Sequence, residues 1–402
     1  MHDRSILLRR SRRLVSRRSV AAGIGSMIAA MPAIALSPLT ASAEQSAACG
    51  APVELSDGWR LSTPEAAGLD RRRLCSVIDW LDGFPQANIH SILVVRRGEL
   101  VFEHYRKGPD QRWGRPLGEV VHGPDVKHDL RSVTKSVIAL LVGITLDRKL
   151  IPSLDQPVFE YFPEYADLRT PEKDRILLRH LLTMSAGLEW DEYRPYTDPQ
   201  NSQIQMIRSP DRYRFALDRR VVAPSGQVWN YSGGCTELLG AVIRKAAARP
   251  LDQVAREFLF DPLGITDIAW TGYPNSDIPS AAGGLRLRAR DLAKIGQLVL
   301  QRGQWDGRQV VPAHWIDEAT APQIGPADRP YFYGYQWWLG RSLINRRELP
   351  WVAGIGLGGQ RVFVVPALDL VAVVTAGLYN DAKQSWVPLL ILNRYLLAAV
   401  MG

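Results

Sequence analysis

Apolar residues along the chain recur with two different periods, and these periods predict which segments are helices and which are strands. The segment 69–81 has apolar residues at every third or fourth position, which is the spacing of a helix with one buried face. Two runs rich in β-branched and aromatic residues follow at 91–95 and 100–105. The residues between them include Gly98, so we expect these two strands to form a hairpin.

The pattern changes in the middle of the chain and changes back towards the C-terminal end. From 126 to 273, apolar helical runs are interrupted by proline and glycine, which indicates short helices joined by loops. Further on, strands are expected at 336–339, 360–366 and 370–376, followed by an apolar helix at 387–400.

This order of elements predicts the fold class. Strands towards both chain ends, separated by a helical middle, indicate an α/β (α+β) protein with an antiparallel sheet built from both chain ends and flanked by helices. A helical subdomain would be inserted into it, with a cleft between the two. We place the sheet-containing subdomain at residues 44–125 and 274–402, the helical subdomain at 126–273 and an export signal at 1–43.

Composition narrows the class of protein. The 402 residues are 46% hydrophobic, which suits an ordinary globular protein with a large core. Of the formal net charge of +8, residues 1–43 carry +6, which leaves +2 for the rest. Because that remainder has no basic stripe interleaved with aromatic residues, we do not expect nucleic-acid binding.

The N-terminal segment has the features of an export signal. Arginines cluster before an uncharged run at 19–43, which ends in the small-x-small pattern Ala-Ser-Ala typical of cleavage sites. The arginine pair at 17–18 also resembles a twin-arginine signal. We therefore expect a periplasmic or secreted protein that begins at Glu44 and is not inserted in the membrane after cleavage. An uncleaved anchor is the alternative, because the run is long enough to span a bilayer if Pro32 is tolerated.

The three cysteines say little about the fold. Cys49, Cys75 and Cys235 are too few for a dense disulfide framework, even in an oxidising compartment. A Cys49–Cys75 bridge is left open by the sequence. Cys235 lies in an apolar helical run, where we expect a small buried side chain.

A hydroxyl and an amine lie three residues apart where an apolar helix is expected to begin. In the run Ser-Val-Thr-Lys, Ser132 and Lys135 share one face of that helix, near the positive end of its dipole. Lys135 in its neutral form can accept the proton of Ser132, which would make the hydroxyl an activated nucleophile. The alternative is a capping serine followed by a solvated lysine.

Two further motifs favour the nucleophile hypothesis. Trp-Asn-Tyr-Ser-Gly-Gly at 229–234 precedes a second apolar helical run, and Gly-Leu-Gly-Gly-Gln at 356–360 leads into a strand-like run. The ordered set Ser-x-x-Lys, Tyr-Ser-Gly and a glycine-rich strand resembles the serine β-lactamase and penicillin-binding fold family. Within that family, the chain is most similar to the class C β-lactamase-like branch of esterases and 6-aminohexanoate-dimer hydrolases.

The resemblance implies catalytic roles for residues of these motifs. Ser132 would be the acylated nucleophile and Lys135 its partner. The hydroxyl of Tyr231 would relay the proton to the leaving group and then take part in deacylation by water. The backbone N–H groups of Ser132 and Gln360 would form the oxyanion hole.

The resemblance also marks substrate-binding positions, two of which depart from the family pattern. Gly358 and Gly359 would let a substrate approach the backbone closely, and Asp191 falls in a loop that borders the cleft in similar proteins. The family's lactamases and peptidases usually carry Asn where this chain has Gly233, and Lys or His where it has Leu357. The motifs therefore lack an amide for the substrate's acyl amide and a cation for a substrate carboxylate.

The sequence thus predicts an exported serine hydrolase that cleaves a small-molecule ester or non-peptide amide through a Ser132 acyl-enzyme. Two alternatives stay open: a β-lactamase or D-alanyl-D-alanine peptidase, and a non-catalytic family member that binds a ligand. The motifs Gly-x-Ser-x-Gly and His-Glu-x-x-His are absent and the seven histidines are scattered, so we expect no metal site and no cofactor. The natural substrate and the oligomeric state are left undefined.

Overall fold

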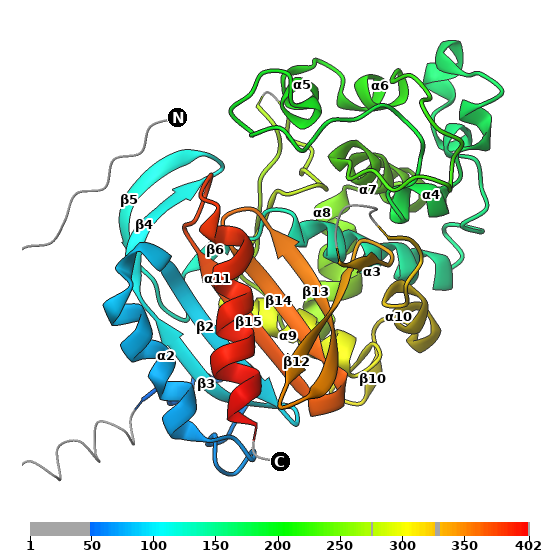
Figure 1. The fold of residues 1–402 in the computed structure, drawn as a ribbon. Coiled ribbons are helices and arrows are strands. Elements are labelled where there is room, and N and C mark those ends of the chain that lie inside the picture. Colours follow the sequence, from blue (N-terminus) through cyan, green and yellow to red (C-terminus); the bar gives the residue numbers. More distant parts are fainter. Residues whose placement is uncertain (1–48, 275, 326–329, 401–402) are drawn as a thin grey trace, which may run out of the picture. The chain divides into compact units, whose positions relative to one another are not determined.

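One large sheet organises the protein (Figure 1). The computed structural model describes residues 49–274, 276–325 and 330–400, and the predicted export signal at 1–43 lies outside them. The strand order is β1-β3-β2-β15-β14-β13-β12-β11, and every neighbouring pair is antiparallel except β1 and β3. The strands span Arg60–Leu61 (β1), Ile89–Arg96 (β2), Glu99–Tyr105 (β3), Phe332–Tyr333 (β11), Trp338–Ile344 (β12), Arg347–Gly356 (β13), Gln360–Val365 (β14) and Leu370–Ala376 (β15).

Smaller sheets surround the large one within the described ranges. A hairpin is formed by Lys107–Arg112 (β4) and Arg115–Val121 (β5). Lys127–Asp129 (β6) and Ala269–Trp270 (β7) both pair with Leu285–Arg288 (β8). A second short pair consists of Gln304–Trp305 (β9) and Arg308–Gln309 (β10).

Helices cover both faces of the large sheet. In Figure 1, α2 (Arg71–Gly83) and α11 (Lys383–Ile391) lie in front of the sheet, and α3 (Val133–Asp147) and α9 (Ala289–Leu300) lie behind it. Along β2, Ile92 and Val94 belong to the core on the α2 side, whereas Leu93 and Val95 belong to the core on the α3 and α9 side. Successive side chains of a strand point to opposite faces, so a strand covered on both faces is apolar throughout.

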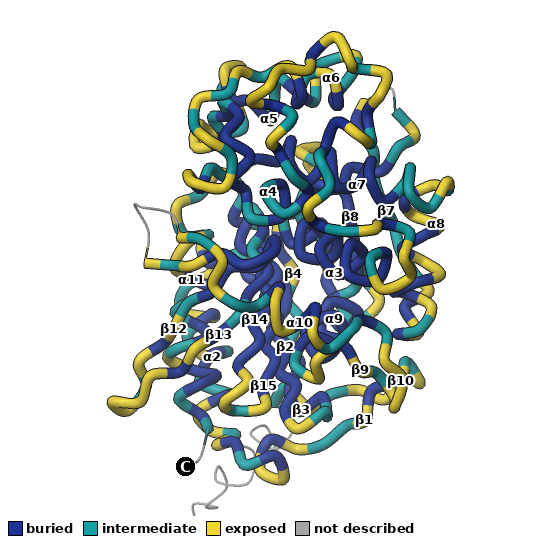
Figure 2. Tube along the Cα trace, turned by 90° about the vertical axis from the view of Figure 1, so that its right-hand side faces the viewer, coloured by how far each residue is buried: buried dark blue, intermediate teal, exposed yellow. Residues whose placement is uncertain are grey.

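The remaining helices lie mostly between α3 and β8 in the chain. They are Leu178–Leu182 (α4), Ser202–Arg208 (α5), Arg212–Leu217 (α6), Gly233–Ala247 (α7), Leu251–Ala255 (α8) and, later, Ala313–Ala319 (α10). Single 3₁₀ or π turns occur at Pro85–Ala87, Val158–Tyr161, Pro163–Leu168, Lys173–Arg175, Arg256–Phe260, Asp261–Leu263, Pro366–Leu368, Leu392–Leu396 and Leu397–Ala399. Figure 2 shows α3, α7 and α9 among the buried parts of the trace.

The fold class predicted from the sequence is confirmed. Strands β1 to β3 come from the N-terminal side and β11 to β15 from the C-terminal side, with the helices α3 to α8 between them. β6 and β7, near the two ends of the predicted helical subdomain, both pair with β8, so the inserted segment leaves and returns at neighbouring places. The subdomain boundaries at 125 and 273 stay predictions.

Local turn chemistry explains the predicted hairpin and one missed element. Arg97 and Gly98, between β2 and β3, have φ angles of 54° and 77°, and both central residues of a type I′ turn need positive φ. The β4–β5 hairpin was not expected, because most residues of β5 are exposed and show no alternation of apolar and polar positions.

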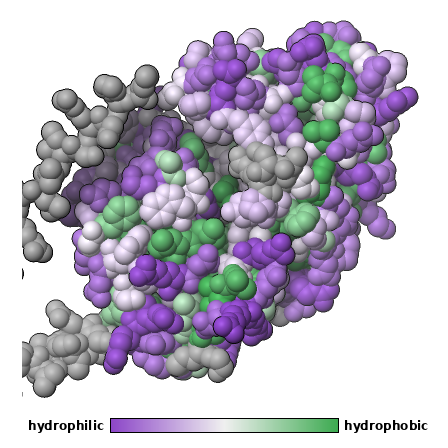
Figure 3. Space-filling view, viewed as in Figure 1, coloured by the Kyte–Doolittle hydropathy of each residue, from purple (hydrophilic) through white to green (hydrophobic). Residues whose placement is uncertain are grey.

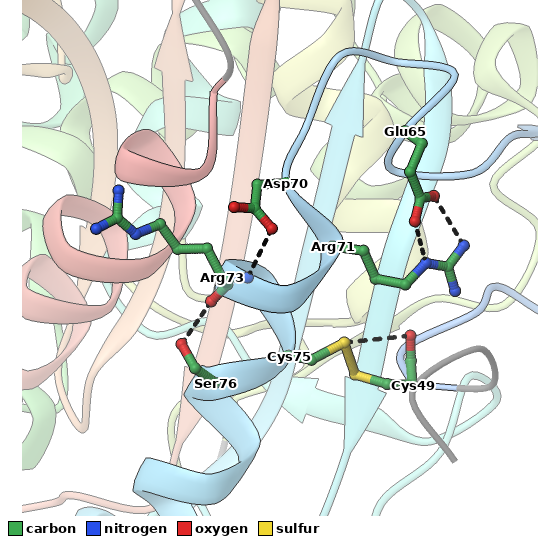
Figure 4. Close-up of a disulfide and its surroundings, with 7 residues drawn as sticks. All are labelled: Cys49, Glu65, Asp70, Arg71, Arg73, Cys75 and Ser76. Carbon is green, nitrogen blue, oxygen red and sulfur yellow. Dashed lines mark hydrogen bonds and ion pairs between the residues drawn. A yellow bond between two sulfur atoms is a disulfide. The ribbon is translucent and has the colours of Figure 1, made fainter. Parts of the chain in front are cut away.

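A disulfide joins Cys49 to Cys75, the pairing that the sequence left open (Figure 4). It links the segment before β1 to α2. That helix begins after Asp70, whose carboxylate accepts a hydrogen bond from the backbone N–H of Arg73 at 3.1 Å. Cys235 on α7 is buried, as expected for that apolar run.

Among the described residues, the exposed large apolar side chains are scattered over several elements. Figure 3 shows a mostly hydrophilic face with separate apolar areas, and strongly exposed examples such as Val121 and Leu343 lie on different elements. A search of the described helices finds none with both the length and the apolar character needed to cross a bilayer.

Candidate active site

Ser132 lies at the start of α3, and its hydroxyl makes no hydrogen bond to the helix backbone. It is the N-cap residue by position, yet its side chain makes no capping hydrogen bond. Arg131 has a φ of 51°, an unfavourable value for a residue with a side chain, and this turns the chain from β6 into the helix. Instead of capping, Ser132 Oγ accepts a hydrogen bond from Lys135 Nζ at 3.2 Å. The hydroxyl is therefore paired with Lys135 and does not cap the helix, which is the contact that the predicted nucleophile requires.

Lys135 is buried and held from two sides. The residue is 2% exposed, and its Nζ also donates a hydrogen bond to the backbone oxygen of Ala282 at 2.7 Å. The ring centroid of Tyr231 lies 5.1 Å from the same Nζ. The ring of Tyr231 in turn stacks on Trp338 with centroids 5.9 Å apart. The structure therefore brings the three predicted catalytic residues together.

Helix α7 anchors the backbone that accepts this lysine bond. Glu237 on α7 accepts hydrogen bonds from the N–H of Ala282 at 3.0 Å and from the hydroxyls of Tyr273 and Ser280 at 2.7 and 2.8 Å. Its other carboxylate oxygen lies 3.2 Å from Arg212 Nη1. A buried carboxylate that is fully bonded in this way holds its neighbours in fixed positions. Because α7 begins two residues after Tyr231, one helix positions both the tyrosine motif and the acceptor for Lys135.

A cavity of about 750 Å³ opens over the Ser132 and Lys135 pair. Ala282 lines it as well. So does Leu357 from the turn between β13 and β14. The size is within the range of small-molecule sites, which are typically several hundred Å³. The cavity also includes residues that the sequence analysis did not select, among them Arg112, Arg115, Arg131, Gln203 and Tyr273.

The glycine-rich turn before β14 has the conformation that its glycines allow. Gly358 and Gly359 have φ angles of 87° and 96°, which residues with side chains rarely adopt. Gln360 opens β14 opposite Gly356, and its side chain is buried: Nε2 donates to Ala376 O at 2.7 Å. A Cβ on Gly356 would lie 2.3 Å from the backbone oxygen of Leu130, so this turn lies against the chain just before Ser132. The role of the Gln360 N–H in an oxyanion hole stays a prediction.

Asp191, which was expected to contact the substrate, does not line this cavity, whereas its neighbour Glu192 does. The Asp191 carboxylate pairs with Arg194 at 2.6 Å in an exposed position. Glu192 lines the cavity, and its Oε2 accepts hydrogen bonds from the N–H of Gly233 at 2.7 Å and from Trp190 Nε1 at 2.8 Å. The sequence could not separate these adjacent carboxylates, because the direction of a loop side chain depends on packing.

Gln203 on α5 fills the place where the family usually has an asparagine side chain. A Cβ at Gly233 would lie 2.0 Å from Gln203 Oε1, so the glycine leaves room for this amide. Gln203 Nε2 donates to the hydroxyl of Tyr273 at 2.9 Å, while Oε1 is buried and has no hydrogen-bond partner among the described residues. An amide therefore does reach the cavity, but from a helix some thirty residues earlier in the chain.

Arginines surround the cavity where the motif itself lacks a cation. Arg112 and Arg115 come from the β4–β5 turn, and Arg131 immediately precedes the nucleophile. The Arg131 guanidinium pairs with Asp129 at 3.2 Å and lies 5.0 Å from the ring centroid of Trp113. Leu357 thus removes one positive charge from the motif, but positive charge remains in the cavity wall.

The chain is similar in sequence to a known family and to characterised relatives. The beta-lactamase family model matches residues 82–385. The chain is 26% identical over 316 residues to the 6-aminohexanoate-dimer hydrolase of Paenarthrobacter ureafaciens, covering 74% of each protein. It is 29% identical over 184 residues to the esterase EstB of Burkholderia gladioli, covering 44% of this chain and 45% of the esterase.

A solved structure shows the same fold at low sequence identity. The octameric penicillin-binding protein homologue from Pyrococcus abyssi superposes with a TM-score of 0.62 at 19% identity, over 83% of this chain and 78% of that protein. At this level of identity the likeness concerns the fold alone.

Proposed function

The chain belongs to the beta-lactamase family, and from that premise we propose that it cleaves an ester or a non-peptide amide through an acyl-enzyme on Ser132. As a serine hydrolase of this family, it acts on amides or esters. One observation carries the finer proposal: Lys135 Nζ lies 3.2 Å from Ser132 Oγ, with the Tyr231 ring 5.1 Å from that amine, at a cavity of about 750 Å³.

Acylation requires the proton of the Ser132 hydroxyl to move as the oxygen attacks. In its neutral form, Lys135 Nζ accepts that proton while Ser132 Oγ bonds to the substrate's carbonyl carbon. The negative charge that develops on the carbonyl oxygen would be stabilised by the backbone N–H groups of Ser132 and Gln360. The bond to the leaving group then breaks, and the leaving group receives a proton by way of Tyr231. In the second half of the reaction, water attacks the carbonyl carbon of the acyl-serine. The bond from that carbon to Ser132 Oγ breaks, the carboxylic acid leaves, and Oγ takes up a proton by the same path.

The motif departures favour an ester or linear amide over a β-lactam. Leu357 offers no charge-assisted contact to a carboxylate, and Gly233 offers no side chain at all. Gln203 lines the cavity, and its buried Oε1 has no hydrogen-bond partner among the described residues. A small rotation of the amide would let this oxygen accept a hydrogen bond from a substrate N–H. The similarity to a 6-aminohexanoate-dimer hydrolase and to an esterase supports this substrate class.

A specific observation also favours the second candidate, a β-lactamase or D-alanyl-D-alanine peptidase. Substrates of both enzymes carry a carboxylate, and Arg112, Arg115 and Arg131 line the cavity. A bidentate guanidinium contact could bind that group in place of the family's lysine. A panel of short-chain p-nitrophenyl esters, linear amides, penicillins and cephalosporins distinguishes the two candidates.

We expect the unmodified protein to hydrolyse p-nitrophenyl esters with a higher kcat/KM than cephalosporins. Leu357→Lys should raise the preference for carboxylate-bearing substrates by roughly 10- to 150-fold at most, because a hydrogen bond to a charged group contributes about 1.5–3 kcal/mol. Leu357→Met keeps the size without the charge and should leave the preference unchanged. If the unmodified protein hydrolysed cephalosporins better than esters, the cavity arginines would be binding the substrate carboxylate. The β-lactamase function would then replace the proposed ester or amide hydrolysis.

Export is the other part of the proposal. It is supported by the signal-like pattern at 1–43 and by the Cys49–Cys75 disulfide, since such bonds persist mainly in oxidising compartments. N-terminal sequencing of protein recovered outside the cytoplasm should find Glu44 as the first residue. Recovery with residues 1–43 still attached would instead favour a membrane anchor. Replacing the arginine pair at 17–18 with lysines should block export if the twin-arginine route is used.

A further inference from the structure

Three histidines and one aspartate that the proposed reaction does not use meet in a buried cluster. His90 lies on β2, Asp110 on β4, His122 directly after β5 and His128 on β6. One ligand atom from each lies within 4.8 Å of the others, and each residue is at most 8% exposed. None of the four lines the cavity at Ser132. These three histidines lie apart in the sequence, and the fold brings them together.

Outer hydrogen bonds determine which imidazole nitrogens carry a proton. His90 Nε2 lies 3.2 Å from Asn88 Oδ1, and His128 Nδ1 lies 3.1 Å from the backbone oxygen of Asp129. Both of these oxygens are acceptors, and the orientation of Asn88 is set because its Nδ2 donates to the oxygen of Pro109 at 3.0 Å. His90 Nε2 and His128 Nδ1 are therefore donors, which is the usual arrangement behind metal-binding histidines.

The other two nitrogens then face each other as lone pairs. His90 Nδ1 and His128 Nε2 are 2.9 Å apart. Two neutral nitrogens that have no hydrogen between them repel at this distance. A cation bound to both would turn that repulsion into attraction.

The side chains of Asp110 and His122 approach the same place. Asp110 Oδ1 lies 3.6 Å from His128 Nε2, and Asp110 Oδ2 lies 3.9 Å from His122 Nε2. These separations are too long for hydrogen bonds. His122 Nε2 is buried and has no hydrogen-bond partner in the part of the chain that the structure describes. Each of the four side chains thus brings one atom that can ligate a metal to the same place.

The Asp110 carboxylate has no full counter-charge from the neighbouring arginines. Arg131 and Arg286 both pair with Asp129 instead. The hydrogen bond that the carboxylate receives from Tyr379 is long, with 3.4 Å between the oxygens. Leaving a buried carboxylate uncompensated is costly, so a cation at this point would remove a large penalty.

We propose that His90, His122, His128 and Asp110 bind one divalent transition-metal ion, with Zn²⁺ as the best fit. Imidazole nitrogens suit Zn²⁺ and its neighbours in the first transition row, whereas Ca²⁺ and Mg²⁺ prefer oxygen ligands. Bonds of about 2.0–2.1 Å place the ligand atoms of tetrahedral Zn²⁺ about 3.3 Å apart. The separations from His128 Nε2 to His90 Nδ1 and to Asp110 Oδ1, 2.9 and 3.6 Å, lie on either side of that value, and one ligand atom from each of the four residues lies within 4.8 Å of the others.

Four protein ligands leave no open coordination position, so the ion is structural and takes no part in the acyl chemistry. It joins β2 of the large sheet to β4, to the end of β5 and to β6. The ion would stabilise the position of the β4–β5 hairpin, because β5 is largely exposed and buries little apolar surface of its own. Residues 111–115 at the tip of this hairpin line the cavity, so the ion would hold one wall of the active site in place.

Zinc binding is measured on the full chain after it is stripped with a chelator and dialysed into metal-free buffer. Calorimetric titration with Zn²⁺ alone should give one ion per chain, and elemental analysis should find the same ratio after removal of free ion. Because the site exists only in the folded state, Tm should rise by about 4 °C when free Zn²⁺ is 100 times Kd. If the unmodified chain did not bind Zn²⁺, the three histidines and Asp110 would form a buried polar cluster without a metal, and the proposal would be overturned.

Variants identify the site. His90→Gln and Asp110→Asn should each weaken Zn²⁺ binding by about 100-fold or more, since even outer partners of metal ligands cost 10–100-fold. His314→Gln, at an exposed histidine on α10, should bind like the unmodified chain. Unchanged affinity in a folded His90→Gln variant would place the ion elsewhere. If the variants do not fold, Co²⁺ in the unmodified chain decides: an intense four-coordinate absorption band supports the proposal, and a weak six-coordinate band overturns it.

Discussion

Replacing Ser132 with alanine is expected to abolish turnover and leave the fold intact. The change removes the nucleophilic oxygen, so kcat should fall by roughly 10⁴-fold or more. Loss of a helix cap lowers the free energy of unfolding by about 1 kcal/mol. The Ser132 hydroxyl makes no capping bond to α3, so its removal should cost less than that. Turnover is measured with a p-nitrophenyl ester, and stability by thermal unfolding.

Covalent labelling makes this test specific. A fluorophosphonate probe should add its mass to the Ser132 peptide of the unmodified chain and to no peptide of the Ser132→Ala variant. Ser136 lies on the same helix, and its Oγ donates to the backbone oxygen of Gln336 at 2.8 Å; Ser136→Ala is therefore a matched control that should keep its labelling. Labelling of Ser132→Ala at the unmodified rate would refute the assignment. An unmodified chain that neither turns over substrate nor reacts with the probe would favour the non-catalytic ligand-binding alternative.

Lys135→Ala and Tyr231→Phe should each slow the chemical step by roughly 10²–10⁴-fold, the range for a positioned acid or base. Both side chains act on one proton path, because the Lys135 amine contacts Ser132 Oγ and faces the Tyr231 ring. Their double variant should therefore lose far less than the product of the two single losses. Single-turnover acylation rates measure this directly.

Two controls separate catalysis from packing in that experiment. Lys135→Met keeps most of the side-chain volume, and its rate should match that of Lys135→Ala if the amine matters rather than the packing. Tyr165→Phe removes a hydroxyl that is bonded to Asp211 and lies outside the cavity, and it should keep full activity. Fully multiplicative losses in the double variant would show that Lys135 and Tyr231 act independently, contrary to the proposed mechanism.

Elements with a strong local period and no interrupting proline or glycine could be predicted from the sequence, and other elements could not. The hairpin of β2 and β3, the strands β14 and β15 and the helix α2 all lie within a few residues of their expected positions. Strand β13 was missed, as was the β4–β5 hairpin. The residues of β5 show no alternation of buried and exposed positions, so periodicity carries no signal there. In β13 the alternation is present from Glu348 to Ala353, but Pro350 and the glycines at 354 and 356 are residues that a strand pattern disfavours.

The sequence by itself determined the pairing of Ser132 with Lys135, because residues three apart on a helix share a face whatever the rest of the chain does. It also determined the fold class, since the order of strands and helices limits how their apolar faces can be buried. Two contacts depend on the tertiary structure. Gln203 fills the space beside Gly233, and His90, Asp110, His122 and His128, which are separated in the chain, form a cluster of residue types that ligate metals. Such contacts join segments far apart in the chain, and their formation depends on how whole elements pack rather than on any local pattern.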